Sequence, residues 1–110
     1  MKRLFTILLF LGAFCTYGKS LSNAELQHNT HDAYEKSDKK LNIIYKKLMN
    51  RLEKEDKKAL RKAQRNWLKF RDTECYFEGY PYRGGTGEYT MTVSCLYELT
   101  EERINHLKNL

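Results

Sequence analysis

The chain has 110 residues, with 20 basic and 14 acidic side chains and a formal net charge of +6 at neutral pH. A chain of this length forms one small domain with a single modest core. Acidic and basic residues are mixed along the sequence, and the net charge is small for a dedicated nucleic-acid-binding domain. The composition therefore predicts a single domain and argues against nucleic acid as a partner.

Residues 1–18 have the pattern of a cleaved secretory signal. A basic start is followed by an apolar run over residues 4–14, which is too short to cross a bilayer core of ~30 Å comfortably. Phe14 precedes Cys15, at a position where a lipoprotein signal requires a small residue. We therefore expect cleavage after Gly18 and an exported protein, periplasmic or secreted, with no lipid anchor and no stable membrane insertion.

Cleavage at this position leaves a domain of residues 19–110 with two cysteines, Cys75 and Cys95. An even number of cysteines is expected in an oxidising compartment, so we predict that these two form a disulfide. The bond would close a loop of about 21 residues and stabilise the domain by roughly 3 kcal/mol in chain-entropy terms. Because a core of this size is marginal, such a link matters for stability.

Three helices are expected. The first begins at Ser22-Asn23-Ala24-Glu25, which has the spacing of a capping box, and Asp56 is expected to cap the second after a polar turn. Glycines after Glu78 end the second helix, and the third is expected from about Thr90 to Asn109. The predicted fold is all-α, an antiparallel helical hairpin of two long helices plus a shorter third helix, tied by one disulfide.

Helical periodicity assigns an inward face to each helix. The first helix is expected to turn inward Leu26, Ala33, Tyr34, Ser37, Leu41, Ile44, Tyr45, Leu48 and Leu52. The second is expected to turn inward Leu60, Ala63, Trp67, Phe70, Glu74 and Phe77, and the third Met91, Cys95, Leu99, Ile104 and Leu107. A basic stripe on the opposite side of the second helix is interpreted as solvated surface rather than as a site for an acidic partner; it contains Lys58, Arg61, Lys62, Arg65 and Lys69.

Polar residues at the edges of these faces predict a structural network between the first two helices. Hydrogen bonds of this kind set the register of packed helices more than they add stability. The network is expected to contain Asp38 and Asn42 from the first helix and Gln64, Arg65, Arg71 and Asp72 from the second.

The segment between the two cysteines is the only loop-like part of the sequence, with four of the six glycines and the only proline. Its tyrosines are open to two interpretations. They pack on the helix ends as a satellite core, or they form a partner-binding patch, since Tyr and Arg dominate interface hot spots. The residues of such a patch would be Tyr76, Tyr80, Tyr82, Arg83 and Tyr89.

Catalytic and metal chemistry have little support. His28 and His31 lie near Asp32 and Glu35 on the first helix and form a weak metal candidate, but no second ligand cluster accompanies them, so no metal or other cofactor is expected. Disulfide-bonded cysteines cannot act as thiolates, and the chain has no nucleophile elbow, phosphate loop or dinucleotide fingerprint. A small bundle also offers little cleft for a pair of catalytic carboxylates. The sequence therefore predicts a protein that is not an enzyme.

Six stretches form a pattern that covers nearly the whole predicted domain, and the segment from Ala63 to Cys75 is the most specific of them. The pattern resembles the lysozyme inhibitor LprI N-terminal domain family, which consists of small secreted helical proteins of bacteria. The other stretches are Ala24–Gln27, Ala33–Tyr45, Gly84–Thr86, Cys95–Leu96 and Leu99–Arg103.

The resemblance implies an exported protein with a Cys75–Cys95 disulfide that inhibits lysozyme by occluding the muramidase cleft. Members of the family often carry a further cysteine pair near the first helix. Here Asn29 stands at the later position and Lys19 or Ser20 near the earlier one, so no orphan thiol remains.

Charge favours a second hypothesis. After cleavage the net charge is about +4, which a strongly basic animal lysozyme would repel, although acidic residues around Glu98, Glu101 and Glu102 offset this locally. The alternative is an envelope immunity-type or structural binding protein with a different partner, such as another peptidoglycan hydrolase.

Overall fold

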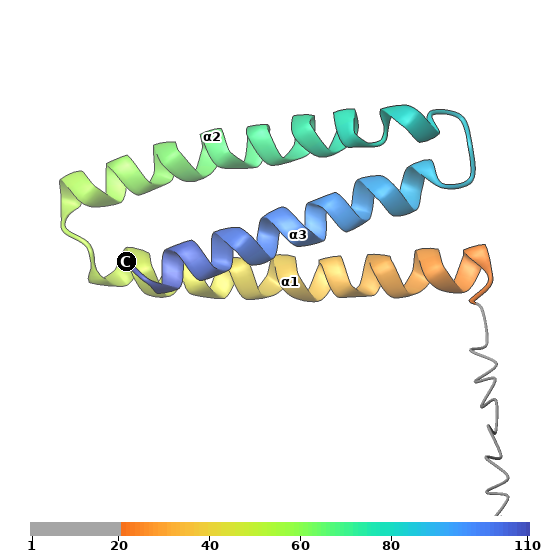
Figure 1. Ribbon diagram of the computed structural model, residues 1–110. Helices are drawn as coiled ribbons and strands as arrows, with labels where there is room; N and C mark the ends of the chain where they lie inside the picture. The colour runs from red at the N-terminus through yellow and green to blue at the C-terminus, as the bar shows by residue number, and fades with distance from the viewer. Residues whose placement is uncertain (1–20) are drawn as a thin grey trace, which may run out of the picture.

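The computed structural model describes residues 21–110, so the predicted signal peptide lies outside the described residues. The described chain forms three long helices and one short 3-10 helix, with no strand among these residues, and the predicted all-α fold is confirmed (Figure 1). In residues 21–110, no helix combines the length and hydrophobicity needed to span a membrane. The elements are α1 (Asn23–Arg51), α2 (Lys54–Glu78), η1 (Tyr80–Tyr82) and α3 (Glu88–Lys108).

The ends of α1 and α2 follow from local capping. Ser22 and Glu25 form the predicted capping box, in which each side chain accepts a hydrogen bond of 3.2 Å from the other's backbone N–H. The prediction that Asp56 caps α2 is wrong, because α2 already begins at Lys54. Asp56 instead lies in the first turn of α2, where its carboxylate interacts favourably with the helix dipole.

Gly79 ends α2 at the predicted position, and α3 approaches it closely there. A Cβ atom on Gly79 would lie only 2.6 Å from the hydroxyl oxygen of Thr92, so a larger residue would require the Thr92 side chain to shift. The third helix begins at Glu88, two residues earlier than expected, and ends at Lys108.

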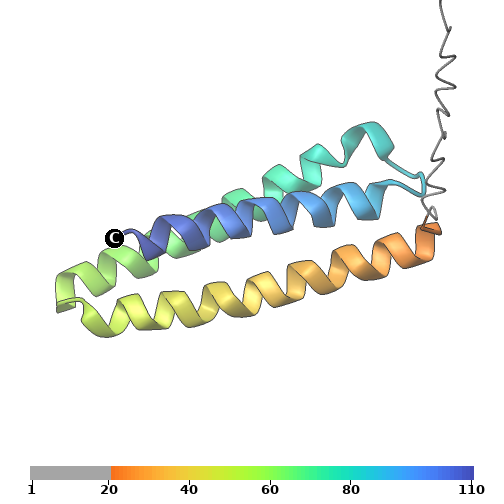
Figure 2. The same ribbon diagram turned by 60° about the horizontal axis from the view of Figure 1, so that its bottom comes forward.

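The three helices form an elongated antiparallel bundle. In Figure 1, α1 and α2 run in opposite directions, and α3 returns between them, so that the C-terminus lies beside the α1–α2 turn. In the turned view of Figure 2, α2 and α3 overlap and cross, and α1 runs along one side of them. The third helix packs against both long helices and most extensively against α1, so it bridges the hairpin rather than only covering it.

The bundle has two ends of different composition. We call residues 39–66 and 103–110 the turn end, because they surround the α1–α2 turn, and residues 21–38 and 67–102 the loop end. The apolar core lies in the turn end, and Trp67 packs against it from the boundary. Its buried members are Leu41, Leu48, Leu60, Ile104 and Leu107.

The predicted inward face of α2 is confirmed at Leu60, which is buried, and at Trp67, which packs against the core, but it is wrong farther along the helix. Phe70 and Phe77 are 51% and 64% exposed, whereas the polar Gln64 and Arg71 are buried. The disulfide explains the difference, because Cys75 must face α3, and the residues one and three turns before it share its face. Single residues also differ from the predicted faces. Ala63, Leu26 and Met91 were expected inward but are exposed, whereas Val93 and Thr100 were not expected inward but are buried.

Candidate interaction site at the loop end

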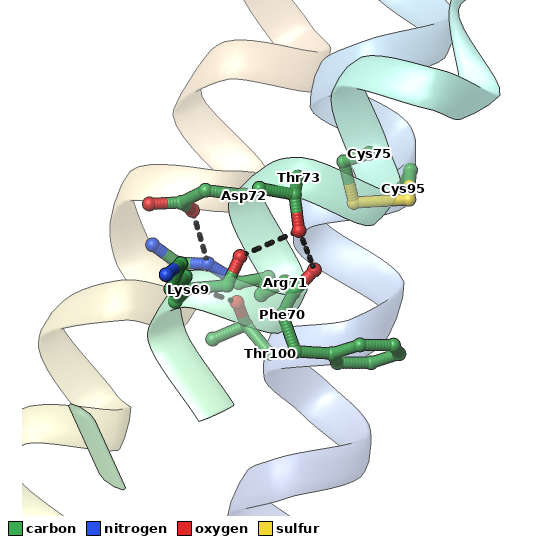
Figure 3. The surroundings of a disulfide bond; sticks show 8 residues. All are labelled: Lys69, Phe70, Arg71, Asp72, Thr73, Cys75, Cys95 and Thr100. Carbon is green, nitrogen blue, oxygen red and sulfur yellow. Dashed lines mark hydrogen bonds and ion pairs between the residues drawn. A yellow bond between two sulfur atoms is a disulfide. The ribbon is translucent and has the colours of Figure 1, made fainter. Parts of the chain in front are cut away.

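The predicted disulfide between Cys75 and Cys95 is confirmed. It joins α2 to α3 across a Cα–Cα distance of 5.3 Å, and Cys75 is completely buried (Figure 3). The bond lies in the half of the bundle that lacks the large apolar core. It therefore fixes the two helices from which the aromatic segment emerges.

Arg71, one helical turn before Cys75, holds all three helices together. Its Nη1 donates hydrogen bonds to Asp38 of α1 (3.2 Å) and to the hydroxyl of Thr100 in α3 (3.3 Å), while its Nε donates to Asp72 (2.9 Å). Figure 3 shows the guanidinium beside Asp72 and Thr100. Burial alone would lower the pKa of Arg71, but its hydrogen bonds and nearby negative charges outweigh burial and raise the pKa above the usual value.

Aromatic rings and a second arginine extend this polar layer. The guanidinium carbon of Arg71 lies 5.5 Å from the ring centre of Tyr34 and 5.3 Å from that of Trp67. Arg103 lies 5.6 Å from the same tryptophan and donates to Gln64 at 3.0 Å. Burial raises the pKa of Tyr34 against the opposing charge of Arg71, and burial lowers the pKa of Arg103.

The structure brings together only part of the predicted polar network. Gln64 bonds to α3 rather than to α1. Asn42 and Arg65 are exposed and form no side-chain hydrogen bond within residues 21–110. Sequence reasoning missed Thr100 and Arg103 because it considered only the edges of the first two helices. The stretch from Leu99 to Arg103 carried a family resemblance, which was the only available signal.

The segment of residues 76–89, called the aromatic loop here, exposes its rings to solvent. Tyr76 is 64% exposed and Tyr80 67% exposed, and Tyr82 and Tyr89 are also exposed. The rings of Phe77 and Tyr80 stack on each other, with centres 6.4 Å apart and planes 9° from parallel. The arrangement is that of a surface patch, not of a satellite core.

Arg83 orders the aromatic loop from within. Its guanidinium carbon lies 4.0 Å from the ring centre of Tyr76, and Nη2 donates to the carbonyl oxygen of that residue at 2.9 Å. Nη1 donates to Glu88, whose other carboxylate oxygen accepts from the N–H of Gly84 at 2.9 Å. The hydrogen bond from Gly84, followed by that from Arg83, lowers the pKa of Glu88. Gly84 has a φ of 77°, a left-handed conformation that favours glycine.

The aromatic loop is also tied to α1. The hydroxyl of Tyr89 shares a hydrogen bond of 2.8 Å with Nδ1 of His31, whose Nε2 lies 3.2 Å from Glu35. The two histidines of the weak metal candidate thus face separate partners, because His28 pairs with Asp32. Within residues 21–110, no three His, Cys, Asp or Glu side chains are placed to share a metal ion.

The two ends of the bundle carry opposite charge. Residues 21–38 and 67–102, the loop end, contain 11 acidic and 4 basic residues, a net charge of −7. Residues 39–66 and 103–110, the turn end, contain 3 acidic and 13 basic residues, a net charge of +10. The charges look mixed along the sequence because the antiparallel chain passes between the two ends three times.

Comparison with known proteins places the chain in a family. Residues 15–107 match the profile of the family described as lysozyme inhibitor LprI. A protein of Rhizobium meliloti (strain 1021), described as uncharacterized, is 32% identical over 105 aligned residues, which cover 84% of this chain and 76% of that protein. No solved structure matches the chain. The matched residues contain the disulfide, Arg71 with its hydrogen-bond partners, and the aromatic loop. The chain therefore belongs to the lysozyme inhibitor LprI family.

Proposed function

We propose that this protein is a periplasmic or secreted inhibitor of lysozyme that binds the enzyme and occludes its substrate cleft. The family match supports a role in inhibition rather than in catalysis. On this proposal the chain needs no cofactor and no reactive group, because it acts by covering the groove in which the muramidase binds peptidoglycan.

The observation that carries the proposal is the exposed and internally ordered aromatic loop. Tyr76, Tyr80 and Tyr82 project large rings into solvent, while Arg83 and the disulfide hold the backbone that carries them. Tyrosines supply much contact area with few rotatable bonds, and a preorganised loop loses little entropy when it binds. Such a loop is suited to fill a cleft on a partner protein.

The distribution of charge also favours the loop end as the binding surface. Animal-type lysozymes are strongly basic, and the overall positive charge of this chain would repel them. The loop end, however, has a net charge of −7 and presents the aromatic loop. A basic enzyme would be steered toward this end, because the potential near a surface depends on local charges more than on the net charge.

A muramidase turbidity assay tests the proposal. The exported protein is mixed with animal and bacterial lysozymes, and we expect slower lysis at a several-fold molar excess. Tyr80→Ala should weaken inhibition by at least about tenfold, as expected for an interface hot spot. Tyr97→Ala is the matched control, because it removes an exposed tyrosine from α3 outside the aromatic loop. The absence of inhibition against every lysozyme would refute the proposal.

The basic stripe favours a second candidate, an envelope immunity-type or structural protein that binds another partner. Lys58, Arg61, Lys62, Arg65 and Lys69 are all exposed on α2 and would suit an acidic peptidoglycan hydrolase. This candidate predicts that Lys62→Glu with Arg65→Glu abolishes binding to such a hydrolase, whereas Tyr80→Ala does not. The opposite pattern would favour the lysozyme inhibitor.

A further inference from the structure

We propose that the groove between α2 and α3 at the loop end binds a cationic, amphipathic segment of the lysozyme partner. The inference rests on the proposed function and names a second contact surface beside the aromatic loop. It concerns residues that the sequence analysis had placed in the core or had not assigned to binding.

The groove is a hollow of about 360 Å³ lined by apolar residues, called the floor here, and by glutamates, called the rim. Phe70, Met91 and Leu99 make up the floor, beside Cys95 of the disulfide. Glu74 and Glu78 of α2 stand on one side, and Glu98 of α3 on the other. The volume is sufficient for one or two side chains of a partner.

The floor of the groove is apolar surface that this chain leaves open. Phe70 is 51% exposed, although it lies well inside α2 rather than at its end, and Met91 of α3 is also exposed. A second hollow shares Phe70 and Leu99 with the first and is also lined by Trp67, Glu102, Arg103 and His106. The first hollow is the one without basic residues, and burial of its floor by a partner would be favourable.

The rim determines which partner fits. No lysine, arginine or histidine lines the first hollow, and within residues 21–110 none of its three glutamates forms an ion pair. Glu74 and Glu78 are one helical turn apart, and so are Glu98 and Glu102, so each wall carries a like-charged pair that disfavours the helix. Positive charges from a partner would relieve this repulsion on both walls.

The groove therefore fits a segment that presents one apolar side chain flanked by lysine or arginine residues. Such a segment occurs naturally on the surface of a basic enzyme. Anionic polymers are disfavoured, because the rim would repel them. The arrangement resembles the general mode in which an amphipathic helix lies in an apolar groove with charges at its edges.

The test compares two pairs of Glu→Gln substitutions that make the same change in charge. Glu74→Gln with Glu98→Gln alters the groove, and Glu53→Gln with Glu55→Gln alters exposed residues at the turn end. Binding to a basic animal lysozyme is measured by calorimetry. We expect the groove variant to raise Kd by at least about tenfold at low salt and the control by less than about twofold.

The groove variant should keep or raise the melting temperature, because it removes like-charge repulsion within each wall. Weaker binding with an unchanged fold would therefore identify the groove as a contact surface. Wild-type affinity of the groove variant would overturn the inference while leaving the proposed function intact. Equal weakening in both variants would also overturn it, because only the overall charge would then matter.

A second probe separates this inference from the proposed function. If the wild-type protein binds no lysozyme, a synthetic helical peptide of lysine and leucine is titrated instead, with the fluorescence of Trp67 as the readout. Trp67 is the only tryptophan of the chain and lines the second hollow, which shares Phe70 and Leu99 with the groove. A response that is lost in Glu74→Gln with Glu98→Gln and kept in the control supports the groove; no response in the wild-type protein refutes it.

Discussion

The turn end and the loop end of this bundle are built on different principles. At the turn end, five buried leucine and isoleucine side chains form an apolar core, and the surface is strongly basic. At the loop end, the helices are joined by a disulfide and by the hydrogen bonds of Arg71, and the surface is acidic and rich in exposed aromatic rings. The apolar core and the proposed binding surface therefore lie at opposite ends of one small domain.

This division has a physical reason. A surface that binds a partner must leave apolar side chains exposed, so they are not available for the core of the free protein. Phe70, Phe77 and Tyr80 are exposed in this way, and at the loop end the buried hydrophobic residues are Val93 and Cys75. A covalent link and a buried arginine then supply the cohesion that apolar packing provides at the turn end.

The largest expected effect is in the apolar core. Ile104 is fully buried, and Ile104→Ala should lower the free energy of unfolding by about 2–5 kcal/mol through lost burial and the cavity left behind. Ile43→Ala is the matched control, because Ile43 is 54% exposed, and its effect should stay within about 0.5 kcal/mol. Urea unfolding measures both, and equal effects would contradict the location of the core.

Loss of the disulfide should be nearly as costly but local in its consequences. Cys75→Ala with Cys95→Ala is expected to destabilise the protein by roughly 3 kcal/mol, because the unfolded chain is no longer restricted. Hydrogen exchange should quicken most at residues 72–95, with less change around Leu48 and Leu107. Uniform quickening along all three helices would show that the two ends are not separately stabilised.

Arg71→Lys should have a smaller effect on the loop end. Lysine keeps the charge but lacks the planar fork that reaches Asp38, Asp72 and Thr100 together, so we expect a loss of about 1–2 kcal/mol. The control is Arg65→Lys, an exposed arginine on the same helix, which should be nearly neutral. Chemical unfolding compares the two variants. Equal stability of the two variants would exclude a structural role for the hydrogen bonds of Arg71.

The smallest effect concerns the aromatic loop in acid. The pKa of Glu88 is lower in the folded protein than in the unfolded chain, so its contribution is complete above the ordinary glutamate pKa of about 4.3. The contribution is lost as the pH falls through the lowered pKa. The amide signal of Gly84, which donates to Glu88, should report this titration by NMR. A midpoint at or above the ordinary glutamate pKa would contradict the hydrogen bonds that Glu88 accepts from Gly84 and Arg83. Glu88→Gln should remove the titration.

Much of the fold could be predicted because it depends on local signals. The capping box at Ser22, the glycine that follows Glu78 and the cysteine pair each specify their feature within a short stretch of sequence. The buried face of α2 could not be predicted in the same way. Periodicity of apolar residues indicated Phe70, whereas the structure buries Arg71, whose burial depends on acceptors on two other helices.

The candidate site was predictable only in part for a similar reason. The tyrosines of the aromatic loop were visible in the sequence, but their exposure was not. The separation of charge also required the topology, because only the antiparallel arrangement places residues 21–38 beside residues 67–102. The groove rimmed by Glu74 and Glu98 is lined by Phe70, which the sequence pattern had placed on the buried face of α2.

The central claim, that the acidic loop end is the binding end, is tested most directly by NMR mapping. Isotope-labelled protein is titrated with a basic lysozyme, and changes in amide signals are assigned along the chain. Perturbations should concentrate between Phe70 and Glu98, and signals from Leu48, Lys58 and Leu107 should stay unchanged. Perturbations that concentrate on the basic face around Lys58 and Lys62 would contradict the account.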